Sequence, residues 1–123
     1  DVYAPCAMGA VLNDATVNKI KAKVIAGAAN NQLANENVHG AILQERGILY
    51  APDFLINAGG IINVYAELAH YDKAEIMRKT ENIYNTTLEI FDYAVANGIT
   101  THQAALTIAQ NRIDLRKIEN GKK

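Results

Sequence analysis

The chain has 123 residues, enough for one domain and too few for two. Twelve basic and thirteen acidic residues give a formal net charge of -1. This balance argues against a nucleic-acid partner and against attraction to anionic membranes. A single cysteine excludes an intrachain disulfide and is typical of a reducing compartment, so we expect a cytoplasmic protein. The apolar runs all end before the roughly 20 residues that a membrane span needs.

Three continuous apolar runs, at residues 2–4, 23–28 and 48–51, predict buried strands. Runs without alternation are typical of a parallel sheet that is covered on both faces. The segments between them, at about residues 14–21 and 36–46, are long enough for helices. Strand, helix, strand, helix, strand predicts a right-handed parallel α/β unit, the Rossmann-like part of the fold.

Long helices follow this α/β unit. Residues 55–69 are mainly apolar, and residues 72–97 form the clearest helical pattern, with a capping-box start at Asp72 and Glu75 and a stop at Gly98. We expect its inner face to carry Ile76, Ile83, Thr87, Ile90 and Ala94, flanked by Met77, Tyr84, Leu88, Phe91 and Val95. We expect Thr101 to cap a last helix whose packed faces carry Leu106, Ala109 and Ile113, and Ala105, Ile108 and Leu115.

The chain begins directly on a strand-like segment, and three strands are too few for a complete doubly wound domain. We therefore expect residues 1–123 to be one structural unit cut from a longer polypeptide. One edge of the sheet should then be paired by strands that lie outside this sequence.

Each predicted strand is followed by small and polar residues, at positions 5–10, 28–32 and 51–53, and a further such motif spans 56–63. In open α/β sheets ligands bind beyond the carboxyl ends of the strands, so these loops should line one crevice. Small residues there let a flat ligand approach the backbone, and asparagine amides offer a donor and an acceptor. The alternative is that these residues only end strands and cap helices.

In this order, the motifs resemble the amino acid dehydrogenases for glutamate, leucine, phenylalanine and valine. Within that family they are most similar to the leucine dehydrogenase group. The resemblance rests on residues 3–10 (YAPCAMGA), 24–33 (VIAGAANNQL), 50–53 (YAPD) and 56–64 (INAGGIINV), and it extends to about residue 115. It implies the second half of an NAD-binding domain followed by carboxyl-terminal helices.

The resemblance also implies what this chain does not contain. The sequence has no Gly-x-Gly-x-x-Gly loop for the pyrophosphate of NAD. The family's catalytic lysines and aspartate belong to the preceding domain, so we expect no catalytic residue here and an inactive isolated chain. Five lysines of this chain are not expected to replace them and should be solvated on the helix surfaces: Lys19, Lys21, Lys23, Lys73 and Lys79.

The positions that carry over belong to the nicotinamide end of NAD. The resemblance assigns Cys6 and Ala7 to the loop beside the nicotinamide ring, and Asn30 to a contact with its ribose. The expected cofactor-binding set is Cys6, Ala7, Ala28, Ala29, Asn30, Asn31 and Asn57. The implied reaction is the oxidative deamination of an L-amino acid to a 2-ketoacid and ammonia, in which NAD supplies the redox chemistry.

The resemblance places Asn57, Gly59, Ile61 and Val64 at the substrate. Glutamate-specific relatives carry a serine at the position of Val64, and a valine there cannot pair with a buried carboxylate. An apolar substrate is therefore expected, and Ala10 favours a branched aliphatic one. Without the family, Ile61 and Val64 would be interpreted equally well as ordinary helix core.

Other interpretations remain open. A nucleophilic Cys6 would need a neighbouring base, so buried packing is the expectation for it. His39, His70 and His102 lack metal-ligand spacing, so no metal site is expected. The chain could instead be a non-catalytic helical module that self-associates, or part of a glutamate- or phenylalanine-type relative. The expected partners are the amino acid substrate, the preceding part of the same polypeptide and further copies in a homo-oligomer.

Overall fold

Three two-residue strands form a parallel sheet in the order β1 (Val2–Tyr3), β2 (Val24–Ile25) and β3 (Leu49–Tyr50). The computed structural model describes residues 1–121. Residue 24 pairs with residue 2 on one side and with residue 49 on the other. The predicted parallel α/β unit is confirmed, although each strand is shorter than its apolar run.

The connection from β1 to β2 differs from the prediction. Only a short 3-10 turn, η1 (Val17–Lys19), forms where a helix was expected at residues 14–21. The Asn13 side chain accepts a hydrogen bond from the Ala15 amide at 3.0 Å, and the Thr16 hydroxyl accepts one from the Asn13 amide at 3.0 Å. Such local side-chain bonds compete with helix formation, which explains why the helix prediction is wrong.

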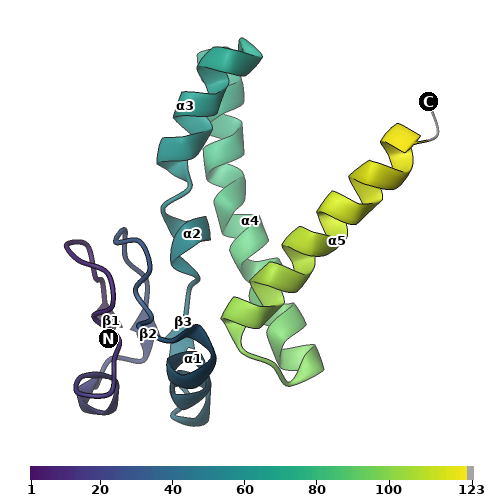
Figure 1. Ribbon diagram of the computed structural model, residues 1–123. Coiled ribbons are helices and arrows are strands. Elements are labelled where there is room, and N and C mark those ends of the chain that lie inside the picture. Colours follow the sequence, from purple (N-terminus) through teal and green to yellow (C-terminus); the bar gives the residue numbers. More distant parts are fainter. Residues whose placement is uncertain (122–123) are drawn as a thin grey trace.

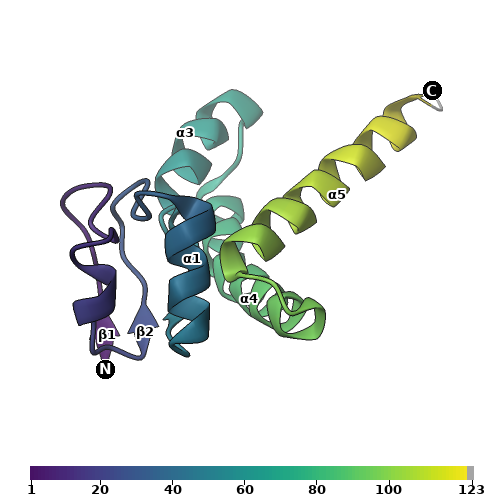
Figure 2. The same ribbon diagram turned by 60° about the horizontal axis from the view of Figure 1, so that its bottom comes forward.

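The second connection is the predicted helix, α1 (Glu36–Glu45), whose N-cap residue is Asn35. The Asn35 side chain accepts hydrogen bonds from the amides of Asn37 and Val38, both at 3.1 Å. Helix α1 lies beside the sheet (Figure 2). The core that they share consists of Leu12, Val17, Ile25, Leu33, Leu43, Ile48 and Tyr50.

The sheet is not buried on both faces within this chain. Val2 is 61% exposed and Leu49 is 38% exposed, so that part of the strand prediction is wrong for residues 1–121. β1 has β2 as its neighbour on one side only among the described residues.

Four helices follow the sheet: α2 (Asp53–Ile56), α3 (Gly59–Ala69), α4 (Lys73–Asn97) and α5 (Thr101–Gly121). α3 and α4 run side by side, and α5 diverges from the lower end of α4 (Figure 1). The Asp72 side chain accepts a hydrogen bond from the Glu75 amide at 2.8 Å, and Gly98 ends α4 with a left-handed backbone, as predicted. No helix among residues 1–121 is both long and apolar enough to cross a lipid bilayer.

Helices α4 and α5 share a small second core, which consists of Ile90, Ala94, Ala104, Ala105 and Ile108. The predicted inner face of α4 is therefore buried near its carboxyl end, whereas Ile76 and Ile83 are half-buried. The cap of α5 is Thr100 rather than Thr101. The Thr100 hydroxyl accepts a hydrogen bond from the Gln103 amide at 3.1 Å, and the Gln103 side chain accepts one from the Thr100 amide at 3.2 Å.

The packing predicted for α5 is only partly correct. Ala105 and Ile108 are buried, but Leu106, Ile113 and Leu115 are each more than half exposed. Ala109 is exposed as well, and so is every described residue after it. The sequence pattern identified a helix here, but the body of this chain covers only its first two turns.

Candidate functional site

The loops that follow β2 and β3 meet through two asparagine side chains. The Asn57 side-chain nitrogen donates to the side-chain oxygen of Asn30, 27 residues away in the sequence, and to the backbone oxygen of Ala28 at 3.3 Å. Asn30 lies in the loop that follows β2, and Asn57 lies directly after α2. The structure thus brings together the amides that the sequence predicts at opposite sides of one crevice.

A cleft of about 470 Å³ opens at this contact. Its lining residues are Ala28, Asn30, Phe54, Asn57 and Ile61. Polar amides and apolar side chains therefore share one cleft, as is typical of a site for a small molecule with a polar and an apolar end. Four of the five lining residues belong to the predicted site, and Phe54 does not.

The loop after β1 packs against the loop after β2 rather than over the cleft. The amide of Ala29 donates to the Pro5 oxygen at 2.9 Å, and the amide of Ala10 donates to the Asn31 oxygen at 2.7 Å. Ala10 and Asn31 both have left-handed backbones, with φ of 55° and 52°. Ala29 is buried in this junction, whereas Asn31 is exposed.

Cys6 and Ala7 lie on this first loop and do not line the cleft. Both are exposed. The expectation that Cys6 is buried for packing is therefore wrong for this chain. Cys6 follows the edge strand β1, which has a neighbour on one side only among residues 1–121, and this leaves its side chain exposed.

The two predicted substrate-pocket residues lie one turn apart on α3. Ile61 is 70% exposed and lines the cleft, and Val64 is 63% exposed and lies one turn beyond it. Among residues 1–121 neither belongs to a buried core, so the interpretation as ordinary helix core is wrong for this part of the chain. Gly59 begins α3 beside the cleft, and Gly60 has open space where a side chain would be.

Sequence reasoning missed the residues that hold the two loops together. The buried Asp53 carboxylate accepts hydrogen bonds from the Gln32 amide and from the Phe54 amide, both at 2.7 Å. The fully buried Gln32 side chain donates to the backbone oxygens of Gly27 and Ala29, at 2.8 and 2.9 Å. Pro52-Asp53 after a strand is a signal for a helix start, but nothing in the sequence indicates a partner 21 residues away.

Tyr50, on β3, is buried in the main core three residues before Asp53. Its burial raises the pKa of the phenol far above the usual value, and the negative charges of Asp53 and Glu36 raise this pKa further. The hydroxyl group therefore stays neutral throughout the physiological pH range.

Two histidines are buried, and each lies beside one carboxylate. His39 accepts a hydrogen bond from the Asn35 amide at 2.9 Å through Nδ1, and its Nε2 lies 3.0 Å from Asp14. The Nε2 of His102 lies 3.2 Å from Glu36, and its ring packs against Phe54 in a T-shaped arrangement with ring centroids 5.5 Å apart. Among residues 1–121 no three histidine, cysteine or acidic side chains come together in a group that could hold a metal ion.

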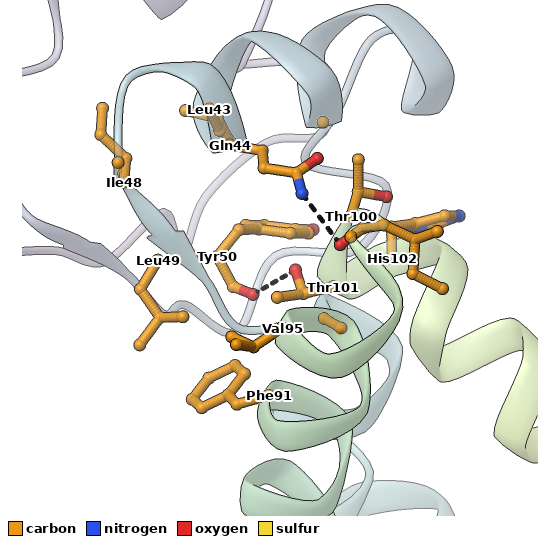
Figure 3. Close-up of a pocket in the computed structure, with 15 residues that line it drawn as sticks. Leu43, Gln44, Ile48, Leu49, Tyr50, Phe91, Val95, Thr100, Thr101 and His102 are labelled. Atoms are coloured by element: carbon orange, nitrogen blue, oxygen red, sulfur yellow. Dashed lines mark hydrogen bonds between the residues drawn. The ribbon is translucent and has the colours of Figure 1, made fainter.

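A second cavity, of about 290 Å³, lies at the outer edge of β3, between α1 and the start of α5 (Figure 3). Two hydrogen bonds cross this region. The Gln44 side chain donates to the Ile99 oxygen at 3.1 Å, and the Thr101 hydroxyl donates to the Tyr50 oxygen at 2.6 Å. None of the sequence-predicted site residues lines it, and its lining is mainly apolar. It is a packing gap between sheet and helices rather than a site with convergent polar groups.

Comparison with known proteins places these loops in a family. The family model described as Glutamate/Leucine/Phenylalanine/Valine dehydrogenase matches residues 1–121. The chain is 48% identical over 122 residues to the L-tryptophan dehydrogenase of Nostoc punctiforme, covering 99% of this chain and 35% of that protein. It is 50% identical over 113 residues to the leucine dehydrogenase of Bacillus cereus, covering 92% of this chain and 31% of that protein.

The fold agrees with these sequence matches. The crystal structure of the Nostoc punctiforme L-tryptophan dehydrogenase superposes with a TM-score of 0.89 and 50% identity, covering 93% of this chain and 34% of that one. The chain thus spans about a third of the length of the relatives that it matches.

Proposed function

The chain belongs to the Glutamate/Leucine/Phenylalanine/Valine dehydrogenase family, and from this we propose that the full-length protein is an NAD-dependent L-amino acid dehydrogenase. Residues 1–123 supply the nicotinamide side of the cofactor site and one wall of an apolar substrate pocket. The remaining site residues, including the proton-transferring lysine and aspartate, belong to the rest of the polypeptide in this proposal.

The observation that carries the proposal is the contact of Asn30 with Asn57 at the mouth of a cleft that also contains Ile61. Two amides fixed by each other can hold the polar groups of a planar ligand in one orientation. The adjoining apolar side chain gives a hydrocarbon substituent a place to pack. A cleft of this kind suits an amino acid whose α-carbon must lie against a nicotinamide ring.

The residues at the cleft fit the nicotinamide end of NAD. Ala28 offers little steric hindrance beside Asn30, and the exposed loop with Cys6 and Ala7 leaves room along the neighbouring strand end. Asn31 and Ala29 would support this turn through the backbone, because their main-chain groups bond to the loop after β1. When bound, NAD accepts a hydride from the α-carbon of the amino acid.

The reaction in this proposal balances as L-amino acid, NAD⁺ and water giving 2-ketoacid, ammonium, NADH and a proton. The α-carbon loses a hydride and the amine loses a proton, and water then replaces the nitrogen. The role of this chain is orientation: Asn57 and Asn30 hold the reacting end of the cleft in place, and Ile61 and Val64 pack against the substrate side chain.

An apolar side chain is the proposed specificity. Ile61 presents hydrocarbon to the cleft beside Asn57, and Val64 extends this apolar surface by one turn of α3. Burying the distal carboxylate of glutamate there without a partner would be costly. Leucine and other branched aliphatic amino acids are the proposed substrates. Phenylalanine- and tryptophan-type specificity differ from this one by pocket volume rather than by polarity.

The test is NADH formation by the full-length protein, offered NAD with L-leucine and then with L-glutamate, L-phenylalanine and L-tryptophan. Leucine turning over while glutamate does not supports the reaction and the pocket. Turnover of glutamate alone would keep the reaction and overturn the assignment of Ile61 and Val64. If no amino acid reduces NAD, the proposal fails.

A second candidate function is a non-catalytic module that self-associates. It is favoured by an exposed apolar stripe on α4, formed by Met77, Tyr84, Leu88 and Val95. Such a module has no use for the paired amides of Asn30 and Asn57. Light scattering shows whether the protein assembles. Two results together would favour this candidate: the Asn57→Ala variant still assembles, and the unmodified protein does not reduce NAD. Assembly together with activity fits the homo-oligomeric enzyme that we propose.

A further inference from the structure

We propose that Asp53 is a positioning residue of the dehydrogenase, whose buried carboxylate sets the spacing between Asn30 and Asn57. This inference rests on the function proposed above. Asp53 does not line the cleft itself, so it acts through the two amides rather than on the substrate.

The carboxylate joins two separate segments of the chain. One oxygen, Oδ2, accepts the Gln32 amide on the loop after β2, and the other, Oδ1, accepts the Phe54 amide at the start of α2, both at 2.7 Å. Asp53 is only 6% exposed. Hydrogen bonds to a carboxylate are short and strong, and burial protects these two from competition with water.

Each of these segments carries one of the cleft amides. Asn30 lies two residues before Gln32, and Asn57 lies four residues after Asp53. The backbone amide of Asn57 donates to the backbone oxygen of Asp53 at 3.0 Å. The Gln32 side chain stiffens the first segment through its bonds to Gly27 and Ala29. A displacement of either segment relative to Asp53 is therefore passed on to the contact between Asn30 and Asn57.

The start of α2 does not by itself explain this arrangement. Asp53 is the first residue of α2, after Pro52 at the cap position, and its bond to the adjacent Phe54 amide is purely local, so a shorter side chain can also make it. The bond to Gln32 spans 21 residues and adds nothing to the start of a four-residue helix. What it fixes is the distance between the loop after β2 and the segment that leads to Asn57.

Two substitutions in the full-length protein separate these roles. Asp53→Asn keeps the shape but leaves one of the two amides facing an NH₂ group. Asp53→Ser keeps an acceptor oxygen beside the Phe54 amide but is too short to reach Gln32. For both we expect the KM for NAD to rise and kcat/KM to fall by about 10- to 100-fold, because small misplacements of orienting groups have effects of this size.

The matched control is Leu43→Ala, which removes a side chain from the main core on α1, outside the residues that line the cleft. At a temperature where the folded fractions of the variants are equal, it should leave the KM for NAD unchanged. A purely structural role of Asp53 would give Asp53→Ser the same unchanged KM, and that result would overturn the proposal.

A double-mutant cycle with Asn57→Ala gives the second readout. If Asp53 acts through Asn57, Asp53→Ser should lower kcat/KM much less in the Asn57→Ala protein than in the unmodified one. Independent, multiplicative losses would overturn the positioning role while leaving the dehydrogenase proposal intact. An unmodified full-length protein that neither binds NADH nor reduces NAD would instead overturn the proposed function, and this role with it.

Discussion

Gly27 lies against Pro5 so closely that no side chain fits between them. A Cβ atom on Gly27 would lie 2.1 Å from the Pro5 oxygen and 2.5 Å from its nitrogen. This contact joins the ends of β1 and β2 at the point where their loops begin. The glycine is therefore required by the approach of two backbones and not by an unusual backbone angle.

We expect Gly27→Ala to lower the free energy of unfolding by about 3 kcal/mol or more, because the methyl group would overlap backbone atoms that cannot move without separating the strands. Urea unfolding measures the change. The control is Gly60→Ala, where nothing lies within 4 Å of the new atom. It should raise the stability of α3 by about 0.5–1 kcal/mol. Equal stability of the Gly27→Ala and unmodified chains would contradict the close approach.

The start of α5 gives a second prediction. Thr100→Ala removes the hydroxyl group that accepts the Gln103 amide, and it should lower the free energy of unfolding by about 1–2 kcal/mol. Thr107→Ala, about two turns further along, removes a hydroxyl group that only donates back to the Gln103 oxygen. This control should change stability by less than about 0.5 kcal/mol. Similar losses in the two variants would show that Thr100 is not the cap.

Because the Tyr50 phenol is buried, we expect the chain to lose stability at alkaline pH. Burial raises the pKa of this phenol in the folded chain, whereas in the unfolded chain that pKa is about 10. As the pH rises above this value, the unfolded form loses a proton that the folded form keeps. The free energy of unfolding should then fall by up to about 1.4 kcal/mol per pH unit through this group alone.

The measurement compares unmodified chain and Tyr50→Phe by urea unfolding from pH 8 to pH 11. The difference between them should be constant at the lower end and should shift in favour of Tyr50→Phe at the upper end. Tyr84→Phe, on the exposed side of α4, is the control. A difference that stays constant up to pH 11 would contradict the burial of a neutral Tyr50 hydroxyl group.

Residues 1–123 alone should bind NAD weakly or not detectably. The sequence holds no Gly-x-Gly-x-x-Gly loop, and the pyrophosphate normally provides most of the anchoring at such a loop and its helix. Isothermal titration calorimetry of the isolated chain with NAD tests this. Binding in the micromolar range would contradict it and would mean that the nicotinamide side suffices for affinity.

Val64 is expected to influence substrate choice in the full-length protein. Val64→Ser introduces a hydroxyl group on α3 one turn from Ile61, and it should increase kcat/KM for longer polar amino acids relative to L-leucine. The ratio of kcat/KM for L-glutamate to that for L-leucine is the quantity to measure. Glu67→Gln, on the same helix and also exposed, is a control for a general effect of surface changes. An unchanged ratio in Val64→Ser would count against the pocket assignment.

Local signals in the sequence predicted the helix boundaries that depend on neighbouring residues. The Asp72 cap and the Gly98 stop of α4 are of this kind, and both are confirmed. The helix expected at residues 14–21 rested on the length of the segment between two strands and not on local signals, and side-chain bonds of Asn13 and Thr16 form a turn there instead. Competition between local bonds and helix formation is decided by small energies that segment length does not report.

The site could be predicted in part because its motifs follow strands. Parallel strands bring their carboxyl ends to one edge, so Asn30 and Asn57 could be expected to be close without knowledge of distances. The carboxylate that holds them could not be expected, since the bond from Gln32 to Asp53 depends on how two loops fold back on each other. The exposure of Cys6 was missed for a related reason, because residue type predicts average burial and not the neighbours of one position.

Helix α5 changes its surroundings midway along its length. Its first turns lie in the second core, but residues 109–121 are all exposed. They are supported by short-range pairs such as Lys117 with Asp114, and by one exposed ion pair to α4, between Arg112 and Glu89. Isolated helical segments of this length are marginal in water. Amide hydrogens near Ala105 should therefore exchange with solvent only when the body opens, whereas those near Leu115 exchange through fraying from the helix end. One continuous helix thus contains two segments with very different protection against exchange.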